Sequence, residues 1–229
     1  MAALLYYITD RRQFPGDAGE QERRLLKKIA ESANAGVDMI QLREKDLSTR
    51  ALEALALQAM AVLAGSHTRL LINSRTDIAL ACGAHGVHLP SDDLAASEVR
   101  TVFSGTGGNS ASFAAPGLVT PGLVTPIIGV SAHSAADVAS AEAHGADFAV
   151  FAPVFEKNGT TRPDGLEQLQ RVCHRTEAAQ PPLPVLALGG ITLRNARRCL
   201  EAGAAGIAAI RLFQQDDVDA VVKTLRENT

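Results

Sequence analysis

A run of charged residues follows an apolar stretch near position 42. Residues 39–46 read MIQLREKD, and the last four, Arg43 to Asp46, are all charged. Apolar strands usually end in turn residues such as Gly, Asn or Pro. Arg can donate two parallel hydrogen bonds to phosphate oxygens, and Lys supplies a movable point charge. We therefore interpret Arg43 and Lys45 as ligands of an anion. The alternative is that Arg43 pairs with Glu44 or with a neighbouring loop.

A pair of glycines ends a second apolar stretch. Residues 183–190 read LPVLALGG and end in Gly189 and Gly190. Without side chains, the backbone N–H groups of such a pair can approach an anion closely. This pattern predicts a phosphate-binding turn, with an ordinary tight turn as the alternative.

The elements that must position these groups repeat along the chain. A glycine at the expected end of a helix, a short turn and an apolar run of strand length recur four times, at 35–43, 82–90, 144–153 and 202–211. Four further apolar runs lie at 4–10, 69–74, 126–133 and 183–190, and amphipathic helical stretches include 20–34, 48–64, 135–143 and 192–201. The runs do not alternate with polar residues, which is typical of parallel strands buried on both faces. Eight strands alternating with helices predict an α/β fold, a (β/α)8 TIM barrel forming a single domain over residues 1–229. An open doubly wound sheet is the structural alternative.

One segment interrupts this repeat. Residues 104–126 are rich in Gly, Ser and Pro and contain GLVTP twice in tandem. The segment is longer than an ordinary strand–helix connection, and its composition predicts a flexible surface loop. We interpret the tandem repeat as a local duplication in a tolerant loop rather than a lid.

Composition excludes several classes of protein. The net charge of −3 provides no general basic surface, so we expect no nucleic-acid partner. The three cysteines form no CxxC pair, which favours a reducing compartment. The N-terminus does not resemble a signal peptide, and no apolar run approaches the ~20 residues that span a bilayer. We expect a cytoplasmic protein with no membrane association. The sequence leaves the oligomeric state open, a homo-oligomer included.

In a barrel the carboxyl ends of all the strands meet at one mouth. The residues at these ends are cations, carboxylates, hydroxyls and glycines: Thr9, Asp10, Arg43, Lys45, Asn73, Ser74, His88, Asp93, Ser131, His133, Gly189, Gly190 and Arg211. The loops after the seventh and eighth strands commonly bind phosphate in this fold, which includes the glycine pair and Arg211. Their convergence predicts a site for anionic, phosphate-bearing ligands.

The histidines have weaker functional signals. His88 lies within a strand, where it faces either the barrel interior or the helices, and we favour a structural role. His133 ends a strand beside Ser131 and could orient a substrate or relay a proton. The others, His67, His85, His144 and His174, are expected on the surface.

Six segments together resemble the thiamine-phosphate synthase and TenI family. They read YYITD, QLREKD, LINSRTDIALACGAHGVHLPSDDL, IGVSAHS, DFAVFAPVFE and VLALGGIT, and they cover nearly the whole chain in order apart from 104–126. The resemblance implies a TIM barrel. The synthases of this family join hydroxymethylpyrimidine diphosphate to a thiazole phosphate and release diphosphate to give thiamine phosphate. The TenI branch includes a tautomerase that shifts a proton on a thiazole phosphate carboxylate.

The resemblance also implies roles for individual residues. Matching positions would bind the pyrimidine diphosphate (Arg43, Lys45, Asn73), hold Mg²⁺ (Asp93), face the reacting groups (Ser131) and cradle the thiazole phosphate (Gly189, Gly190). A reaction in which diphosphate departs first needs stabilisation of the leaving group more than a nucleophile.

Several positions depart from the synthase pattern. Ser74 stands where synthases carry a second metal-binding Asp. The synthase diphosphate loop after the sixth strand is replaced by a segment whose donors, Thr160, Thr161 and Arg162, lie in a shifted register. Glu156 and residues 89–91 look more like TenI, yet the tautomerase histidine is Pro153 here. We therefore expect the synthase reaction, with a TenI-type tautomerase and a non-catalytic thiazole or thiamine phosphate binder as alternatives.

Overall fold

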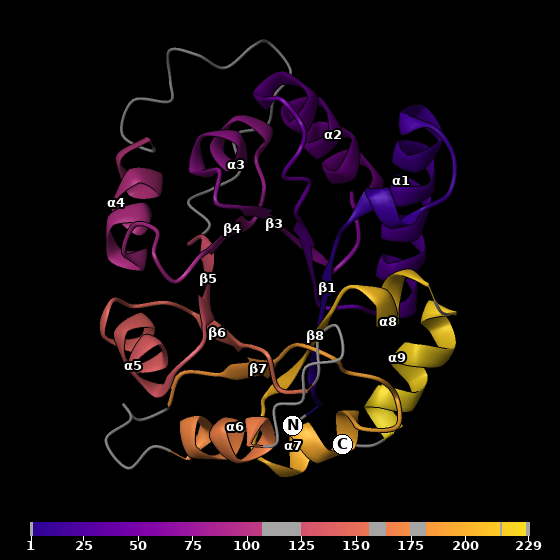
Figure 1. The fold of residues 1–229 in the computed structure, drawn as a ribbon. Coiled ribbons are helices and arrows are strands. Elements are labelled where there is room, and N and C mark those ends of the chain that lie inside the picture. The colour runs from indigo at the N-terminus through magenta and orange to yellow at the C-terminus, as the bar shows by residue number, and fades with distance from the viewer. Residues whose placement is uncertain (1, 107–124, 156–163, 175–181, 216, 228–229) are drawn as a thin grey trace.

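Eight parallel strands close into a barrel in the computed structural model (Figure 1). The structure describes residues 2–106, 125–155, 164–174, 182–215 and 217–227. Each strand pairs with its neighbours in sequence, and the ring closes where Leu4 of the first strand pairs with Gly206 of the last. The strands are β1 (Leu4–Ile8), β2 (Met39–Leu42), β3 (Arg69–Asn73), β4 (Gly86–Leu89), β5 (Ile127–Ala132), β6 (Phe148–Phe151), β7 (Val185–Ala187) and β8 (Gly206–Ala209).

Alternate residues of each strand face the interior of the barrel and the surrounding helices. A small interior cluster includes Tyr6, Leu71 and Phe148, and the rings of Tyr6 and Phe148 meet edge-on with centroids 5.3 Å apart. The neighbouring residues Leu5 and Tyr7 belong to a larger cluster formed with the helices. This burial on both faces explains the continuous apolar runs of the sequence.

Helices surround the barrel on its outside (Figure 1). Asp17 caps the first of them by accepting a hydrogen bond from the Glu20 N–H, and Gly36, with φ of 90°, ends it. The helices are α1 (Ala18–Ala35), α2 (Thr49–Val62), α3 (Thr76–Cys82), α4 (Ala96–Thr106), α5 (Ala135–Ala143), α6 (Gly165–Cys173), α7 (Ala196–Glu201), α8 (Arg211–Gln214) and α9 (Val218–Glu227), with a short 3-10 helix η1 (Arg11–Gln13) after β1. Within the described ranges, no helix is both long and apolar enough to cross a bilayer.

The closed ring confirms the predicted TIM barrel and excludes the open doubly wound sheet. The predicted loop at 104–126 begins too early, because α4 continues to Thr106 and includes residues 104–106. The tandem GLVTP repeats fall within 107–124, outside the described residues. The helix predicted at 192–201 is also too long at its start, since α7 begins at Ala196.

Candidate functional site

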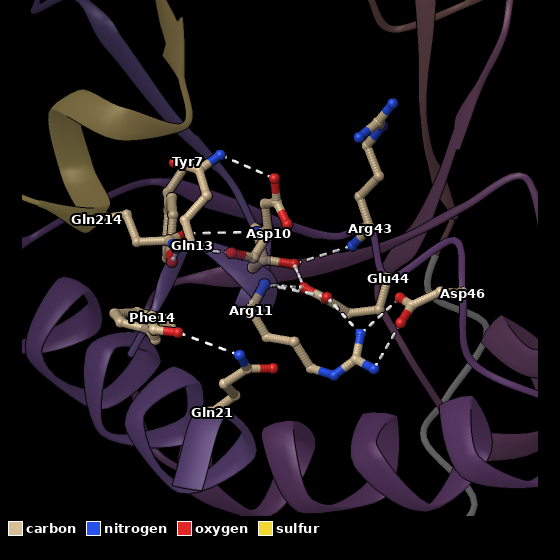
Figure 2. Close-up of polar contacts among 11 residues, drawn as sticks. Tyr7, Asp10, Arg11, Gln13, Phe14, Gln21, Arg43, Glu44, Asp46 and Gln214 are labelled. Carbon is tan, nitrogen blue, oxygen red and sulfur yellow. Dashed lines mark hydrogen bonds and ion pairs between the residues drawn. The ribbon is translucent and has the colours of Figure 1, made fainter. Parts of the chain in front are cut away.

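The charged run after β2 divides into two pairs with different surroundings (Figure 2). Glu44 is buried, 4% exposed, and its carboxylate accepts hydrogen bonds from the Arg11 guanidinium at 3.1 Å and the Thr9 hydroxyl at 2.6 Å. Asp46 accepts two bonds from the same guanidinium, at 2.7 and 2.8 Å. These two carboxylates bind Arg11 rather than a ligand, so the interpretation of the charged run as an anion site applies only to its two cations.

Arg43 and Lys45 are available for a ligand. Arg43 is half-buried and Lys45 is exposed, and neither side chain has a hydrogen-bond or ion-pair partner within the described parts of the chain. The predicted alternative, an Arg43–Glu44 pair, does not form, because Glu44 binds Arg11 instead. In Figure 2 the Arg43 side chain extends away from the Arg11–Glu44–Asp46 cluster.

Polar side chains meet at the carboxyl ends of β2 and β3. The Asn73 side chain at the end of β3 accepts a hydrogen bond from Gln41 at 3.1 Å and donates one to the Ser74 hydroxyl at 3.0 Å. Ser74 has φ of 59°, a left-handed conformation that costs energy in a non-glycine residue. Its N–H donates to the His88 carbonyl at 2.9 Å, which ties the ends of β3 and β4 together.

Three side chains form a hydrogen-bonded chain inside the barrel. His88, 3% exposed, lies 3.2 Å from the Tyr6 hydroxyl through Nδ1 and 2.9 Å from the Ser131 hydroxyl through Nε2. Burial, assisted by the Arg43 charge, lowers the pKa of His88 to about 3, so its imidazole is neutral. The His88 side chain therefore faces the barrel interior, and the structural role that we favour for it stays a prediction.

The tautomer of His88 follows from the Tyr6 hydroxyl. That hydroxyl is fully buried, and within the described residues His88 is its hydrogen-bond partner. A buried donor without an acceptor costs about 1–3 kcal/mol, so Tyr6 donates to Nδ1. The His88 proton then resides on Nε2 and is donated to Ser131. The Ser131 proton remains available for a ligand in the mouth.

The glycine pair after β7 forms a concave backbone turn. Gly189 and Gly190 have φ of 102° and 62°, and a Cβ atom on Gly189 would lie 2.8 Å from the Pro153 Cα. Three successive carbonyls of this turn accept hydrogen bonds. The Leu188 and Gly189 carbonyls accept the backbone N–H groups of Val154 and Phe155, respectively. The Gly190 carbonyl accepts the side-chain amide of Asn195.

The amides of this turn have no such partners. Because the N–H and C=O of a trans peptide point in opposite directions, anchoring the carbonyls aims the following N–H groups the other way. Within the described residues, no acceptor meets the N–H groups of Gly189, Gly190 or Ile191. Successive unpaired N–H groups in left-handed turns bind anions. The turn has the geometry expected of a phosphate-binding site.

Donors suited to Mg²⁺ are few. Asp93 is exposed, and its carboxylate accepts the Leu94 N–H at 2.8 Å. Ser74 offers a neutral hydroxyl where a second carboxylate was expected. Mg²⁺ is often bound by one or two carboxylates together with substrate phosphates. Asp93 fits that arrangement, in which the ligand diphosphate provides further oxygens.

The remaining predicted residues lie at the mouth or outside the described chain. His133 is exposed, and its Nδ1 donates a hydrogen bond to the Ala152 carbonyl at 2.8 Å, which leaves Nε2 as the ring nitrogen not used in that bond. Arg211, the first residue of α8, is exposed. Thr160, Thr161 and Arg162 lie outside the described residues. His85, expected on the surface, is half-buried and accepts the Leu70 N–H at 3.0 Å.

The sequence did not reveal several residues that fix the site by hydrogen bonds to its side chains or backbone. They are Tyr6, Arg11 and Gln41, whose partners lie on other strands or loops, and Asn195, whose partners Gly190 and Thr192 lie just before it in the same connection. Gln41 had a local signal, since a polar residue inside an apolar strand usually has a hydrogen-bonding partner. Arg11 had none, because its partners are separated from it by 33 and 35 positions in sequence.

The fold and the mouth define a class of protein, a (β/α)8 barrel with cations, hydroxyls and free amides gathered at the carboxyl ends of its strands. The family model for "Thiamine monophosphate synthase" matches residues 5–110 and 123–213. A thiamine-phosphate synthase of Albidiferax ferrireducens is 35% identical over 212 residues, 91% of this chain and 83% of that protein. Another, from Clostridium novyi, is 31% identical over 225 residues, 96% of each chain.

A solved structure agrees with these relatives. The thiamine phosphate pyrophosphorylase from Pyrococcus furiosus superposes with a TM-score of 0.73 at 28% identity, covering 99% of this chain and 95% of that one. The chain belongs to the thiamine-phosphate synthase and TenI family.

Proposed function

We propose that this barrel joins hydroxymethylpyrimidine diphosphate to a thiazole phosphate, releasing diphosphate and forming thiamine phosphate. The observation that supports it best is that two separate groups suited to anions lie at one mouth. Among the described residues, Arg43 and Lys45 after β2 have no side-chain partner, and the backbone amides after β7, on a different side of the ring, have no acceptor. Two phosphorylated substrates need two such surfaces, and the family relatives carry the name of this reaction.

The proposed chemistry breaks the bond between the pyrimidine methylene carbon and a diphosphate oxygen, and the electron pair leaves with the diphosphate. The thiazole nitrogen then donates its lone pair to that carbon. Arg43 and Lys45 stabilise the charge that develops on the leaving group. Ser131, with its proton free, donates a hydrogen bond to the reacting pyrimidine. The amides at 189–191 hold the thiazole phosphate, and Arg211 supplies a further cation to it.

Mg²⁺ is part of this proposal. It would be held by Asp93 and would neutralise charge on the diphosphate oxygens. Thr160, Thr161 and Arg162 are further candidates for diphosphate contacts. The cytoplasmic location expected from the sequence stays a prediction.

A TenI-type tautomerase is the second candidate, supported by His133. The hydrogen bond to the Ala152 carbonyl leaves its Nε2 as an exposed base that could move a proton on a thiazole. Pro153 replaces the histidine that such tautomerases use, so His133 would have to supply the base from the neighbouring strand.

One assay separates the candidates. The protein is incubated with both synthase substrates and Mg²⁺, and diphosphate and thiamine phosphate are measured after omission of each component in turn. The synthase forms both products only when both substrates are present. Proton exchange on the thiazole without diphosphate release would support the tautomerase, and binding without either reaction would support a phosphate-binding protein.

A further inference from the structure

We propose that Glu44 and Arg11 are positioning residues that fix the backbone carrying Arg43 and Lys45. The naming of diphosphate as the ligand of these cations rests on the proposed function, whereas the positioning itself rests on contacts within the chain. Both Glu44 and Arg11 are buried, 4% and 6% exposed. Burying two charges is costly unless their geometry and hydrogen bonds are nearly complete, so such a pair is a poor means of stabilising a fold.

The Glu44 carboxylate is surrounded by donors. Its two oxygens accept the Arg11 backbone N–H at 3.1 and 3.0 Å, in addition to the Arg11 guanidinium and the Thr9 hydroxyl. Burial raises the pKa of Glu44, and the hydrogen bonds from Thr9 and Arg11 oppose that shift. The carboxylate therefore joins the ends of β1 and β2 through several bonds at once.

One hydroxyl connects this carboxylate to Arg43. Thr9 Oγ1 donates to Glu44 and accepts the backbone N–H of Arg43 at 3.0 Å. On the other side of Lys45, Asp46 is held by two bonds to the Arg11 guanidinium. The two anchored carboxylates thus alternate in sequence with Arg43 and Lys45. Figure 2 shows both carboxylates at the Arg11 guanidinium and the Arg43 side chain pointing away from them.

The backbone next to Arg11 is fixed by hydrogen bonds. The neighbouring Asp10 donates its N–H to the Gln214 side chain at 3.2 Å and accepts from it at its carbonyl at 2.7 Å. Gln214 also accepts the Tyr7 hydroxyl at 2.9 Å. Arg11 therefore extends from a fixed strand end and sets the place of the loop that follows β2.

The test uses Glu44→Gln with Asp38→Asn as its matched control. Asp38 precedes the same strand at the opposite end of the barrel, where it accepts the Leu5 N–H and pairs with Arg226. Both substitutions replace one carboxylate by an amide. In Glu44→Gln the new NH2 group faces the donors of Arg11, so the loop shifts. A displacement of about 1 Å can reduce a rate by ~10²-fold, so we expect at least a tenfold loss of affinity for inorganic diphosphate by calorimetry.

Two further readouts distinguish positioning from stability. Glu44→Gln should increase amide hydrogen exchange at Arg43 and raise the KM for the pyrimidine diphosphate without changing that for the thiazole phosphate. Asp38→Asn should lower the melting temperature and leave both diphosphate affinity and Arg43 exchange unchanged. In the double variant with Arg43→Ala, Glu44→Gln should cost much less than it costs alone. If Glu44→Gln fails to fold, Thr9→Val, which removes only the connecting hydroxyl, replaces it.

The contrary results are distinct. Unchanged exchange at Arg43 in Glu44→Gln, or fully additive losses in the double variant, would overturn the positioning role. Exchange at Arg43 could increase in Glu44→Gln as expected while wild type neither binds diphosphate nor releases it from the substrate. In that case the proposed function fails and the positioning role stands.

Discussion

The two ends of β1 and β2 are tied together by similar groups but in different ways. At the amino end, Arg226 donates to Asp38 at 2.9 Å and to the backbone carbonyls of Ala3 and Gly36, and Asp38 accepts the Leu5 N–H at 2.7 Å. At the carboxyl end, Arg11 and Glu44 form the corresponding pair, 3.1 Å apart. Each end therefore combines one arginine with carboxylate and backbone N–H groups, and at the carboxyl end a second carboxylate, Asp46, also binds that arginine.

The difference lies in what each pair leaves free. The amino-end bonds join the pair to the backbone around it. The carboxyl-end bonds hold a loop whose cations, Arg43 and Lys45, have no partner among the described residues. Two histidines repeat this contrast, since His85, just before β4, accepts a backbone N–H, whereas His88, within β4, leaves the Ser131 proton unused. Similar groups serve stability at one end of a barrel and function at the other.

The largest expected effect comes from removing a free cation at the carboxyl end. Arg43→Ala should reduce kcat/KM for the pyrimidine diphosphate by ~10²-fold or more, because it removes a charge-assisted contact to the leaving group. The melting temperature should change little. The comparison is Arg226→Ala at the amino end, which should lower the free energy of unfolding by about 1–3 kcal/mol with activity per folded molecule unchanged. If Arg43→Ala instead lowers stability at full activity, Arg43 is structural.

The pH dependence of stability should report the buried His88. Its pKa is about 3 in the folded protein and near 6.5 when unfolded, so between these values only the unfolded chain takes up the proton. Stability therefore falls as the pH falls through this window, by up to about 1.4 kcal/mol per pH unit. In urea unfolding between pH 7 and pH 4, His88→Gln should show a shallower decline than wild type. His85→Gln should change the slope less, because His85 is only half-buried; equal slopes for wild type and His88→Gln would contradict the assignment.

The phosphate turn should tolerate a side chain poorly. A left-handed conformation costs a non-glycine residue about 1–2 kcal/mol, so Gly190→Ala should shift the turn and weaken thiazole phosphate binding by about tenfold. Gly36→Ala is the control, since Gly36 has φ of 90° with open space around it and lies at the amino end. It should reduce stability alone. Unchanged phosphate affinity in calorimetry of Gly190→Ala would argue against the site.

The smallest effect concerns the metal. Ser74→Asp should lower the Mg²⁺ concentration needed for half-maximal activity severalfold, because a carboxylate replaces a neutral hydroxyl. Asp93→Ala should raise that Mg²⁺ concentration severalfold, with Asp92→Asn as a neighbouring control. The tautomerase and binder alternatives predict no response to Mg²⁺ in any of these variants.

Much of the barrel was predictable because its signal is local and repeated. Four of the units have a glycine after a helix followed by an apolar run, four further apolar runs complete the ring, and the cations and glycines that end such runs mark the mouth. The partners of Glu44 were not predictable, because they depend on the packing of β1 against β2 rather than on nearby sequence. The direction of His88 was also undetermined, since a strand that is apolar on both faces does not show which face is inside.

A single-turnover experiment tests most directly whether the residues at the carboxyl ends of the strands join the two substrates. Wild type in excess is mixed with pyrimidine diphosphate, thiazole phosphate and Mg²⁺, and diphosphate and thiamine phosphate are followed in the same quenched samples. We expect equal amounts of both products, formed at the same rate and lost together in Arg43→Ala but not in Asp38→Asn. Thiazole proton exchange without diphosphate, or equal loss in both variants, would contradict it.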